Sequence, residues 1–265
     1  MRHALFSLAL ALSGLLTATV SASTITGFNN GAGFVANGAA SASANSVQLT
    51  SGALAQAGSI FTSTRQDVST FVVQFDYLAS AGIGAADGAT FTIQNSAGGA
   101  SALGSSGGGL GYGGISSSVS FQINLYALSP GGRGTAINSN GLTGQSAGGN
   151  AYQPTGPVPL LGAFVHVTLA YDGANLTQTL ISGVNSYTAS DALDIAAIVG
   201  GTDAFIGFTG GTGFESASQS ISNFTFETAL RSAPDKADVA AVPFPPAIFA
   251  GAFLGAVATR LRRRV

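Results

Sequence analysis

The sequence predicts an all-β protein built as a sandwich of two antiparallel sheets. Several runs alternate apolar and polar residues with the period of a half-buried strand, among them residues 69–78, 89–94 and 118–126. The 265 residues include 38 Gly and only 8% charged side chains, which is typical of secreted β proteins rather than long-helix proteins. The length fits one large β domain with end segments, because all-β sandwiches often exceed about 200 residues as one unit.

The composition also excludes several kinds of function. The chain has no Cys, which removes disulfides, thiolate metal sites and Cys nucleophiles. Between residues 23 and 228 the only basic residues are Arg65 and Arg133, against a clear excess of Asp and Glu. An acidic domain of this kind is a poor partner for nucleic acid, whereas neutral glycans need no basic patch.

The first 22 residues have the pattern of a signal peptide. Arg2 and His3 form a charged start, residues 5–16 are mainly apolar, and Val20-Ser21-Ala22 supplies small residues for cleavage. The alternative is a buried N-terminal helix. We expect the mature chain to begin at Ser23.

The strands follow in order along the mature chain. Residues 25–68 predict short strands and turns, and the next strand, 69–78, places Phe71, Val73, Phe75 and Tyr77 on one face. Strands 89–94 and 118–126 flank a Gly/Ser-rich loop of the kind that is often functional. Later elements are a short strand at 135–138, a hairpin at 164–183 with a type I′ signal at Asp172-Gly173, a single helical turn within 189–201, and closing strands at 204–228.

Several of these segments together resemble one family. ADGATFTIQN (86–95), GGGLGYGG (107–114) and SVSFQINLY (118–126) occur in the order found in the legume-type (L-type) lectins, in their secreted bacterial branch. YDG (171–173), GFTGGTG (207–213) and QSISNFTF (219–226) extend the resemblance over residues 25–228. A single Gly-rich run would be explained as well by a generic surface loop. The resemblance implies a concanavalin-like jelly-roll β-sandwich and a glycan-binding module.

The resemblance also implies a sugar site. A carboxylate to accept hydroxyl protons, N–H donors from closely approaching glycines and an aromatic face are the groups that such a site uses. The matching positions are Asp87, Gly108 or Gly109, Tyr112, and the second loop Gly210, Gly211 and Thr212. The Ala86–Asp87 peptide is often cis in the family. The alternative role for Asp87 is a turn carboxylate that caps backbone N–H groups.

The metal positions of the family are changed in this chain. Where classical members carry Glu and Asp that bind calcium and a transition metal, this sequence has Gln122 and Asn124, and Ala127-Leu128 lies around the position of a family Asn. Calcium affinity depends on charged carboxylates, so two amides make a poor site. His166 lies on a later strand and is expected to be a half-exposed strand residue. We therefore predict a weak or absent metal site and no cofactor, with calcium the one ion left open.

The C-terminal part changes in composition. Residues 229–246 predict a linker that leads into the box Val242-Pro243-Phe244-Pro245-Pro246-Ala247, and residues 247–265 combine an apolar run with an Arg cluster. This order resembles the PEP-CTERM-type sorting tails of Gram-negative bacteria. The resemblance implies export, transient inner-membrane insertion with Arg inside, removal by a sorting protease, and a final place on the cell surface or in the extracellular matrix. A plain C-terminal anchor is the alternative.

Three classes of function remain. Non-catalytic binding of glycans or exopolysaccharide is the favoured class. A structural matrix protein with a lectin fold and no sugar binding is the second. A glycoside hydrolase is the third, but the mature domain has only Glu215 and Glu227 and no cluster of acids on a strand. We predict that the protein is not an enzyme.

Overall fold

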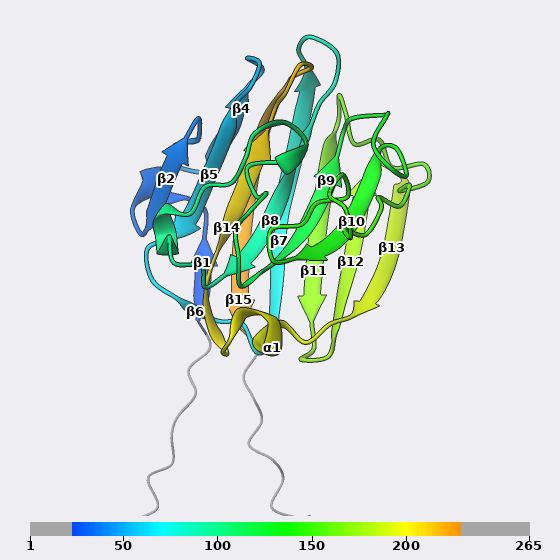
Figure 1. Ribbon diagram of the computed structural model, residues 1–265. Coiled ribbons are helices and arrows are strands. Elements are labelled where there is room, and N and C mark those ends of the chain that lie inside the picture. Colours follow the sequence, from blue (N-terminus) through cyan, green and yellow to red (C-terminus); the bar gives the residue numbers. More distant parts are fainter. Residues whose placement is uncertain (1–22, 229–265) are drawn as a thin grey trace, which may run out of the picture. The chain divides into compact units, whose positions relative to one another are not determined.

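The computed structural model describes residues 23–228, and these residues form two antiparallel sheets packed face to face (Figure 1). The predicted all-β sandwich is confirmed. The predicted signal peptide (1–22), linker (229–246) and apolar, Arg-ended segment (247–265) lie outside the described residues. Within residues 23–228, no helix is long and apolar enough to cross a membrane.

The larger sheet has eight strands in the order β13-β12-β11-β7-β15-β4-β3, with β1 also paired to β15. Its strands are β1 (Thr24–Thr26), β3 (Ser41–Ala42), β4 (Ser46–Ser51), β7 (Phe71–Ala81), β11 (Phe164–Tyr171), β12 (Asn175–Ser182), β13 (Asn185–Ala192) and β15 (Ala217–Thr228). The smaller sheet has seven strands in the order β10-β9-β8-β14-β5-β2, with β6 on β14. Its strands are β2 (Phe34–Gly38), β5 (Ala57–Thr62), β6 (Gln66–Asp67), β8 (Gly88–Gln94), β9 (Ser118–Asn124), β10 (Gly134–Ser139) and β14 (Asp203–Gly211).

The core lies between the sheets and follows from strand alternation. The residues predicted to share one face of the strand at 69–78, from Phe71 to Tyr77, are buried, while Val72 and Gln74 between them are exposed. Aromatic rings from both sheets meet there, for example Phe75 and Phe208 with centroids 4.9 Å apart in an edge-to-face arrangement. In a chain without Trp or Cys, these Phe rings supply much of the buried apolar area.

The outer face of the smaller sheet is also covered. Every residue of β8 and β9 is buried, although Thr90, Thr92, Ser120 and Gln122 point away from the core. The loops that connect the strands lie over this face (Figure 1). Their backbone groups bind the outward polar side chains, so this covered face is where loops far apart in the sequence are attached.

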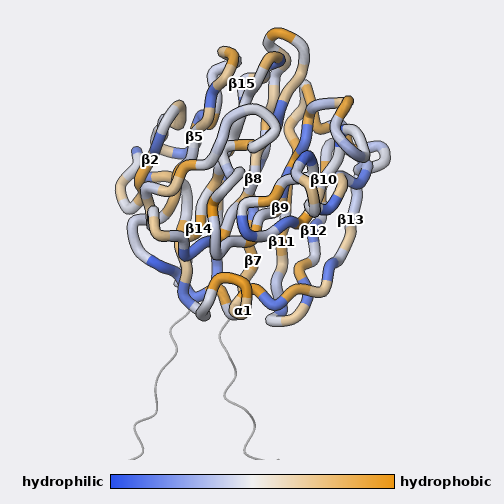
Figure 2. The backbone as a smooth tube through the Cα atoms, in the orientation of Figure 1, coloured by the Kyte–Doolittle hydropathy of each residue, from blue (hydrophilic) through white to orange (hydrophobic). Residues whose placement is uncertain are grey.

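Short helical elements complete the structure. They are the 3-10 turns η1 (Asn29–Gly31), η2 (Gly99–Ser101) and η3 (Gly107–Gly109) and the helix α1 (Ile195–Val199). α1 is the predicted helical turn. The Asp194 side chain accepts from the Ala197 N–H at 2.9 Å, Gly200 ends the helix in the left-handed region, and Ile195 and Val199 face the core. Its apolar colour in Figure 2 agrees with this anchoring role.

The β11–β12 hairpin was predicted with the wrong turn type. The Asp172 N–H donates to the Asn175 carbonyl at 3.2 Å, so the turn residues are Gly173 and Ala174. A type I′ turn needs positive φ at both turn residues, and only Gly173, at +100°, has it. The Asp172 carboxylate accepts from the Ala174 and Asn175 N–H groups, which lowers its pKa.

Candidate functional site

Asp87 lies just before β8, with its backbone fixed on both sides. Its N–H donates to the Gly211 carbonyl at 3.1 Å, and its carbonyl accepts from the Leu125 N–H at 2.8 Å. The Ala86–Asp87 peptide is cis, as the family resemblance implies. Gly88 has φ +146°, and a Cβ there would lie 2.0 Å from the Ile123 carbonyl oxygen, so only glycine fits. These contacts fix the backbone of Asp87 and therefore the direction of its Cα–Cβ bond.

The Asp87 carboxyl is nearly buried and incompletely bonded. The residue is 6% exposed, and its Oδ2 has no hydrogen-bond partner of acceptable geometry. A Cβ on Gly213 or Gly107 would lie 3.1 or 3.9 Å from this oxygen, so a side chain at either position would lie against the carboxylate. An unpartnered buried carboxylate oxygen is costly, and such a group in a protein marks a place where a ligand can supply donors.

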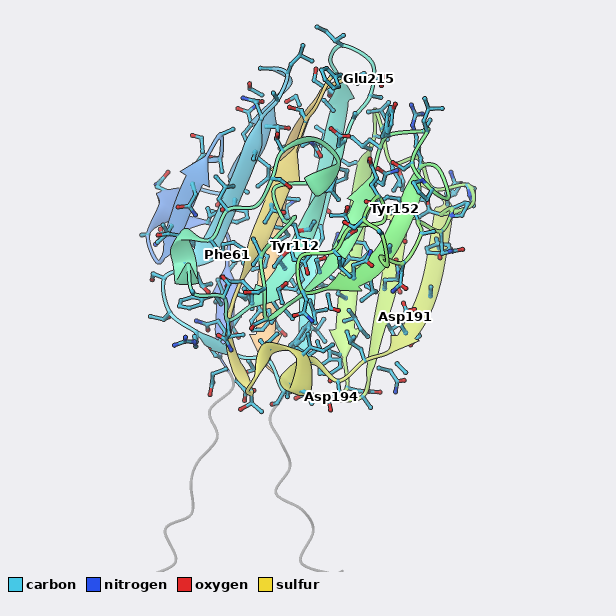
Figure 3. All side chains as sticks on the ribbon, in the orientation of Figure 1. Phe61, Tyr112, Tyr152, Asp191, Asp194 and Glu215 are labelled. Carbon is cyan, nitrogen blue, oxygen red and sulfur yellow. The ribbon has the colours of Figure 1, made fainter. Side chains whose placement is uncertain are left out.

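Burial and charge raise the pKa of Asp87 to about 6. Burial is the larger cause, and the negative charge of Glu215 adds to it. The Gly213 N–H and the Gln145 amide lie close enough to lower the pKa of Asp87 electrostatically, although neither makes a well-aligned hydrogen bond to its Oδ2. The Gly213 N–H donates to the Glu215 carbonyl at 3.0 Å instead. Glu215 is fixed at the tip of its loop because its Oε2 accepts from the Ala85 N–H at 3.1 Å (Figure 3).

The first glycine-rich loop forms the turn η3 beside the carboxyl. The Gly107 N–H donates to the Thr212 carbonyl at 2.9 Å, which attaches the turn to the second loop. The Gly109 N–H donates to the Ser106 carbonyl, whereas the Gly108 N–H has no acceptor in the turns and loops of the described residues. Of the two glycines that the sequence proposed as the donor, Gly108 is therefore the one with a free N–H.

Gln145 lies against this turn and was not singled out from the sequence. A Cβ on Gly108 would lie 2.4 Å from its Oε1, and its Nε2 donates to the Ser129 hydroxyl at 2.9 Å. Gln145 and Gly108 are part of the lining of an open depression of about 460 Å³, together with Gly109, Thr143 and others. Since Gln145 also acts on the Asp87 carboxyl, it connects this depression to the carboxylate.

The second glycine-rich loop serves mainly as a support. Gly210, Gly211 and Thr212 are all buried. The Gly211 carbonyl accepts from Asp87 and from the Gln219 amide, and the Thr212 hydroxyl donates to the Ala53 carbonyl at 2.7 Å. Gly211 therefore positions Asp87 and Thr212 positions η3, whereas Gly210 pairs with Ala89 within the sheet. None of the three presents a side chain to a ligand.

Tyr112 does not provide an exposed aromatic face, and its predicted role is corrected. It is fully buried, although it belongs to the first glycine-rich loop. Its hydroxyl lies 2.7 Å from the Ser118 hydroxyl and accepts from the Gly141 N–H at 3.1 Å. The aromatic residue next to the site in the sequence is Phe214, which is 100% exposed and follows Gly213 directly. A Tyr inside a glycine-rich run looked accessible in the sequence, and only the packing of the loop shows that it is not.

At the two metal positions of the family, both amides are occupied by the protein itself. The Gln122 Nε2 donates to Ser120 and to the Leu142 carbonyl, and its Oε1 accepts from the Asn138 amide and the Gly144 N–H. The Asn124 Nδ2 donates to the Tyr126 and Gly132 carbonyls at 2.9 and 2.7 Å, and its Oδ1 accepts from Ser129. The N–H groups point at the carbonyls of the same loops that a metal would order, so this donor set does not fit a hard cation.

Other acidic and imidazole groups give no alternative metal centre within residues 23–228, where no group of three or more His, Cys, Asp or Glu residues could hold an ion. His166 is half-exposed on β11, as expected, and its Nδ1 lies 2.8 Å from Asp76 Oδ1 on the outer face of the larger sheet.

The fold is that of the legume lectins. A Bauhinia forficata lectin in complex with GalNAc aligns with a TM-score of 0.66 at 19% identity, over 79% of this chain and 99% of that lectin. Basic winged bean lectin with Tn-antigen has a TM-score of 0.66 at 16% identity, over 80% and 100%. The metal-free form of lectin I-B4 from Griffonia simplicifolia has a TM-score of 0.64 at 19% identity, over 80% and 100%. No family model matches the sequence.

Proposed function

We propose that this protein is a non-catalytic carbohydrate-binding protein whose sugar site is built around Asp87 and works without a metal ion. The observation that carries the proposal is the nearly buried Asp87 carboxyl with an unpartnered Oδ2, beside which only the glycines Gly107 and Gly213 lie in the two loops. Sugar hydroxyls are donors of the right kind, because an ionised carboxylate accepts two of them at once. Structures with the same fold hold GalNAc and Tn-antigen, which makes a saccharide the natural class of ligand.

Three further groups complete the proposed site. The free N–H of Gly108 donates to a sugar oxygen, and the Gln145 amide offers both a donor and an acceptor. The fully exposed ring of Phe214 covers the apolar face of the sugar in the role that Tyr112 cannot take. No basic residue is among these groups, so the proposed ligand is neutral.

The amides of Gln122 and Asn124 replace the metal in ordering the loops. Gln122 attaches the Leu142–Gly144 segment to β9, and Asn124 attaches Tyr126 and Gly132. The first of these segments leads directly to Gln145, so the proposed sugar contact is positioned by hydrogen bonds alone. Neutral amides that donate to carbonyls give no reason for calcium to bind.

A hydrolase remains the second candidate, since Glu215 helps to raise the pKa of Asp87 and paired carboxyls are the tools of glycoside hydrolysis. Binding is favoured because the carboxylate of Glu215 is engaged by the Ala85 N–H and lies against Gly84 rather than facing an enclosed cleft. Release of reducing ends from polysaccharide that stops in both Asp87→Asn and Glu215→Gln would establish the enzyme instead.

We also propose export to the cell surface or matrix, on the strength of the N-terminal and C-terminal sequence patterns. The ends of the described domain meet, because the Thr228 N–H donates to the Ser23 carbonyl at 3.0 Å. They lie at the opposite end of the sandwich from Glu215 (Figures 1 and 3). The proposed sugar site would therefore remain accessible on a tethered protein. Cell fractionation of an epitope-tagged chain tests this proposal.

The test of function is a glycan array with the full chain, run with calcium and again with chelator. We expect the same neutral glycans to bind in both conditions and Asp87→Ala to remove the binding of at least one of them. Asp203→Ala, which removes an exposed carboxylate elsewhere on β14, is the matched control and should bind as the wild type does. Binding of every glycan that Asp87→Ala leaves unchanged would exclude the site at Asp87, and no binding to any glycan would favour the structural matrix protein. Binding only with calcium would contradict metal independence.

A further inference from the structure

A second cleft lies at the free edge of the sandwich. The smaller sheet ends at β10, to which only the short segment around Gln153 is added, whereas the larger sheet continues through β12 to β13. The inner face of β13 is therefore left partly uncovered. The resulting space of about 450 Å³, called here the edge cleft, is lined by residues that include Thr135, Asn150, Gln153, Gln178, Tyr187 and Asp191. Its volume lies in the range of about 300–1,000 Å³ found for small-molecule sites.

The floor of the edge cleft contains the amide of Gln178, whose oxygen is hydrogen-bonded and whose nitrogen is not. Gln178 is 3% exposed and points inward between Leu176 and Leu180 of β12. Its Oε1 accepts from the Thr135 hydroxyl at 2.8 Å, but its Nε2 donates to nothing among the described residues. This Nε2 is not among the buried atoms without a partner, so the donor is reached from the cleft that the side chain lines and is open to a ligand there.

The surrounding groups define the chemistry. The Asp191 carboxylate makes no hydrogen bond or ion pair within residues 23–228, and Tyr187 presents a half-buried ring on the same face of β13. The Asn150 and Gln153 side chains add amide oxygens that accept no bond within this part of the chain. Unused amide donors and acceptors, one carboxylate and an aromatic ring suit a ligand rich in hydroxyl groups.

Other ligand classes fit less well. No Lys, Arg or His lines the edge cleft, which disfavours phosphates and other anions. One carboxylate is too little for calcium, which takes 6–8 oxygen ligands. The predominantly polar side chains named above disfavour a purely apolar ligand.

We propose that the edge cleft is a second carbohydrate-binding site, which takes a neutral oligosaccharide or polysaccharide chain. It is separate from the site at Asp87. Asp191 of the cleft and Glu215 beside Asp87 lie well apart in Figure 3, with Tyr152 between them. The Tyr152 ring packs against Gly144, on the loop that leads to Gln145, and so separates the two sites. The inference goes beyond the proposed function and does not depend on Asp87. Two sites on one domain would allow one molecule to join two glycan chains.

The test is isothermal titration calorimetry on the full chain carrying Asp87→Ala, which removes the first site. The probes are cellohexaose, maltohexaose and isomaltohexaose, as neutral chains of different linkage. We expect at least one of them to bind, and we expect Asp191→Ala added to this background to weaken binding about tenfold or more, because hydrogen bonds to a charged group are lost. Gln178→Leu should do the same with the charge unchanged.

Two controls separate a local effect from loss of folding. Asp191 is exposed and unpartnered, so Asp191→Ala should unfold at the same temperature as the parent. Ser190→Ala lies on the opposite face of β13 and should bind as the parent does. The proposal is overturned if none of the three hexasaccharides binds to the Asp87→Ala chain, or if binding is unchanged in both Asp191→Ala and Gln178→Leu. Failure of the site at Asp87 would instead be seen as binding that Asp87→Ala leaves unaltered in the otherwise wild-type chain.

Discussion

The carboxyl of Asp87 should reduce stability while it enables binding, and Asp87→Asn separates the two effects. The pKa of this group rises from 3.8 to about 6 on folding, mainly because it is buried. A raised carboxyl pKa means that the folded state holds the proton more tightly than the unfolded state does. Its contribution to the free energy of unfolding is therefore most favourable below pH 4 and is lost as the pH rises through about 6.

The size of the effect follows from the shift. A difference of about 2 pH units corresponds to about 3 kcal/mol, at roughly 1.4 kcal/mol for each unit. Solvent reaches part of the Asp87 side chain and screens its charge, so we expect about half of this value, roughly 1.5 kcal/mol, at neutral pH. Asp87→Asn keeps the shape and removes the charge. It should therefore be more stable than the wild type by about 1.5 kcal/mol at pH 7.5 and equally stable at pH 4.

The assay is urea unfolding of both proteins at a series of pH values from 4 to 8, with Asp203→Asn as the exposed control. The same proteins are then titrated with a glycan found on the array. We expect Asp87→Asn to bind about 100-fold more weakly, because two hydrogen bonds to a carboxylate are replaced by weaker ones. Wild-type binding should also fall as the pH drops below about 6. An Asp87→Asn protein that is less stable than the wild type at pH 7.5, or that binds glycan equally well, would refute this reasoning.

The remaining predictions concern the ring, the amides and the metal. Phe214→Ala should weaken glycan binding about tenfold in calorimetry and leave the unfolding midpoint unchanged, since the ring is 100% exposed; equal binding would exclude its proposed role. Gln122→Leu should lower the free energy of unfolding by about 2–4 kcal/mol in urea, because the Asn138 amide and the Gly144 N–H lose their buried acceptor. Gln74→Leu, on the exposed outer face of β7, is its control and should change little. Chelator should leave the thermal unfolding midpoint of the full chain unchanged, and a drop of several degrees would indicate a bound metal.

Most of the sandwich could be predicted because strand alternation is a local property. The strand at 69–78, the short strand at 135–138 and the helical turn before β14 all occur where the pattern placed them. The turn after Asp172 was misjudged because Asp-Gly is compatible with more than one hairpin geometry. Register decides which residues occupy the turn, and here it shifts them to Gly173 and Ala174.

The site was predictable only in part, because its residues come together through tertiary packing. A motif located Asp87 and the glycine turn, but Gln145 belongs to a long segment without regular structure, and nothing local connects it to Gly108. Tyr112 and Phe214 both occur in glycine-rich loops, where alternation does not tell buried from exposed. Gln178, in contrast, had a signal in the sequence. It is the one polar residue at an inward position between two Leu residues of a strand.

The replacement of carboxylates by amides at Gln122 and Asn124 also changes which conditions control the site. Loops ordered by a calcium–carboxylate centre would lose their order when calcium is removed or the carboxylates are protonated. Amides do not titrate, and their hydrogen bonds to the Leu142, Tyr126 and Gly132 carbonyls require no ion. The loops should therefore keep the same arrangement across the pH range in which Asp87 changes its charge. It follows that glycan binding should respond to pH through Asp87, as a change in affinity without a change in fold.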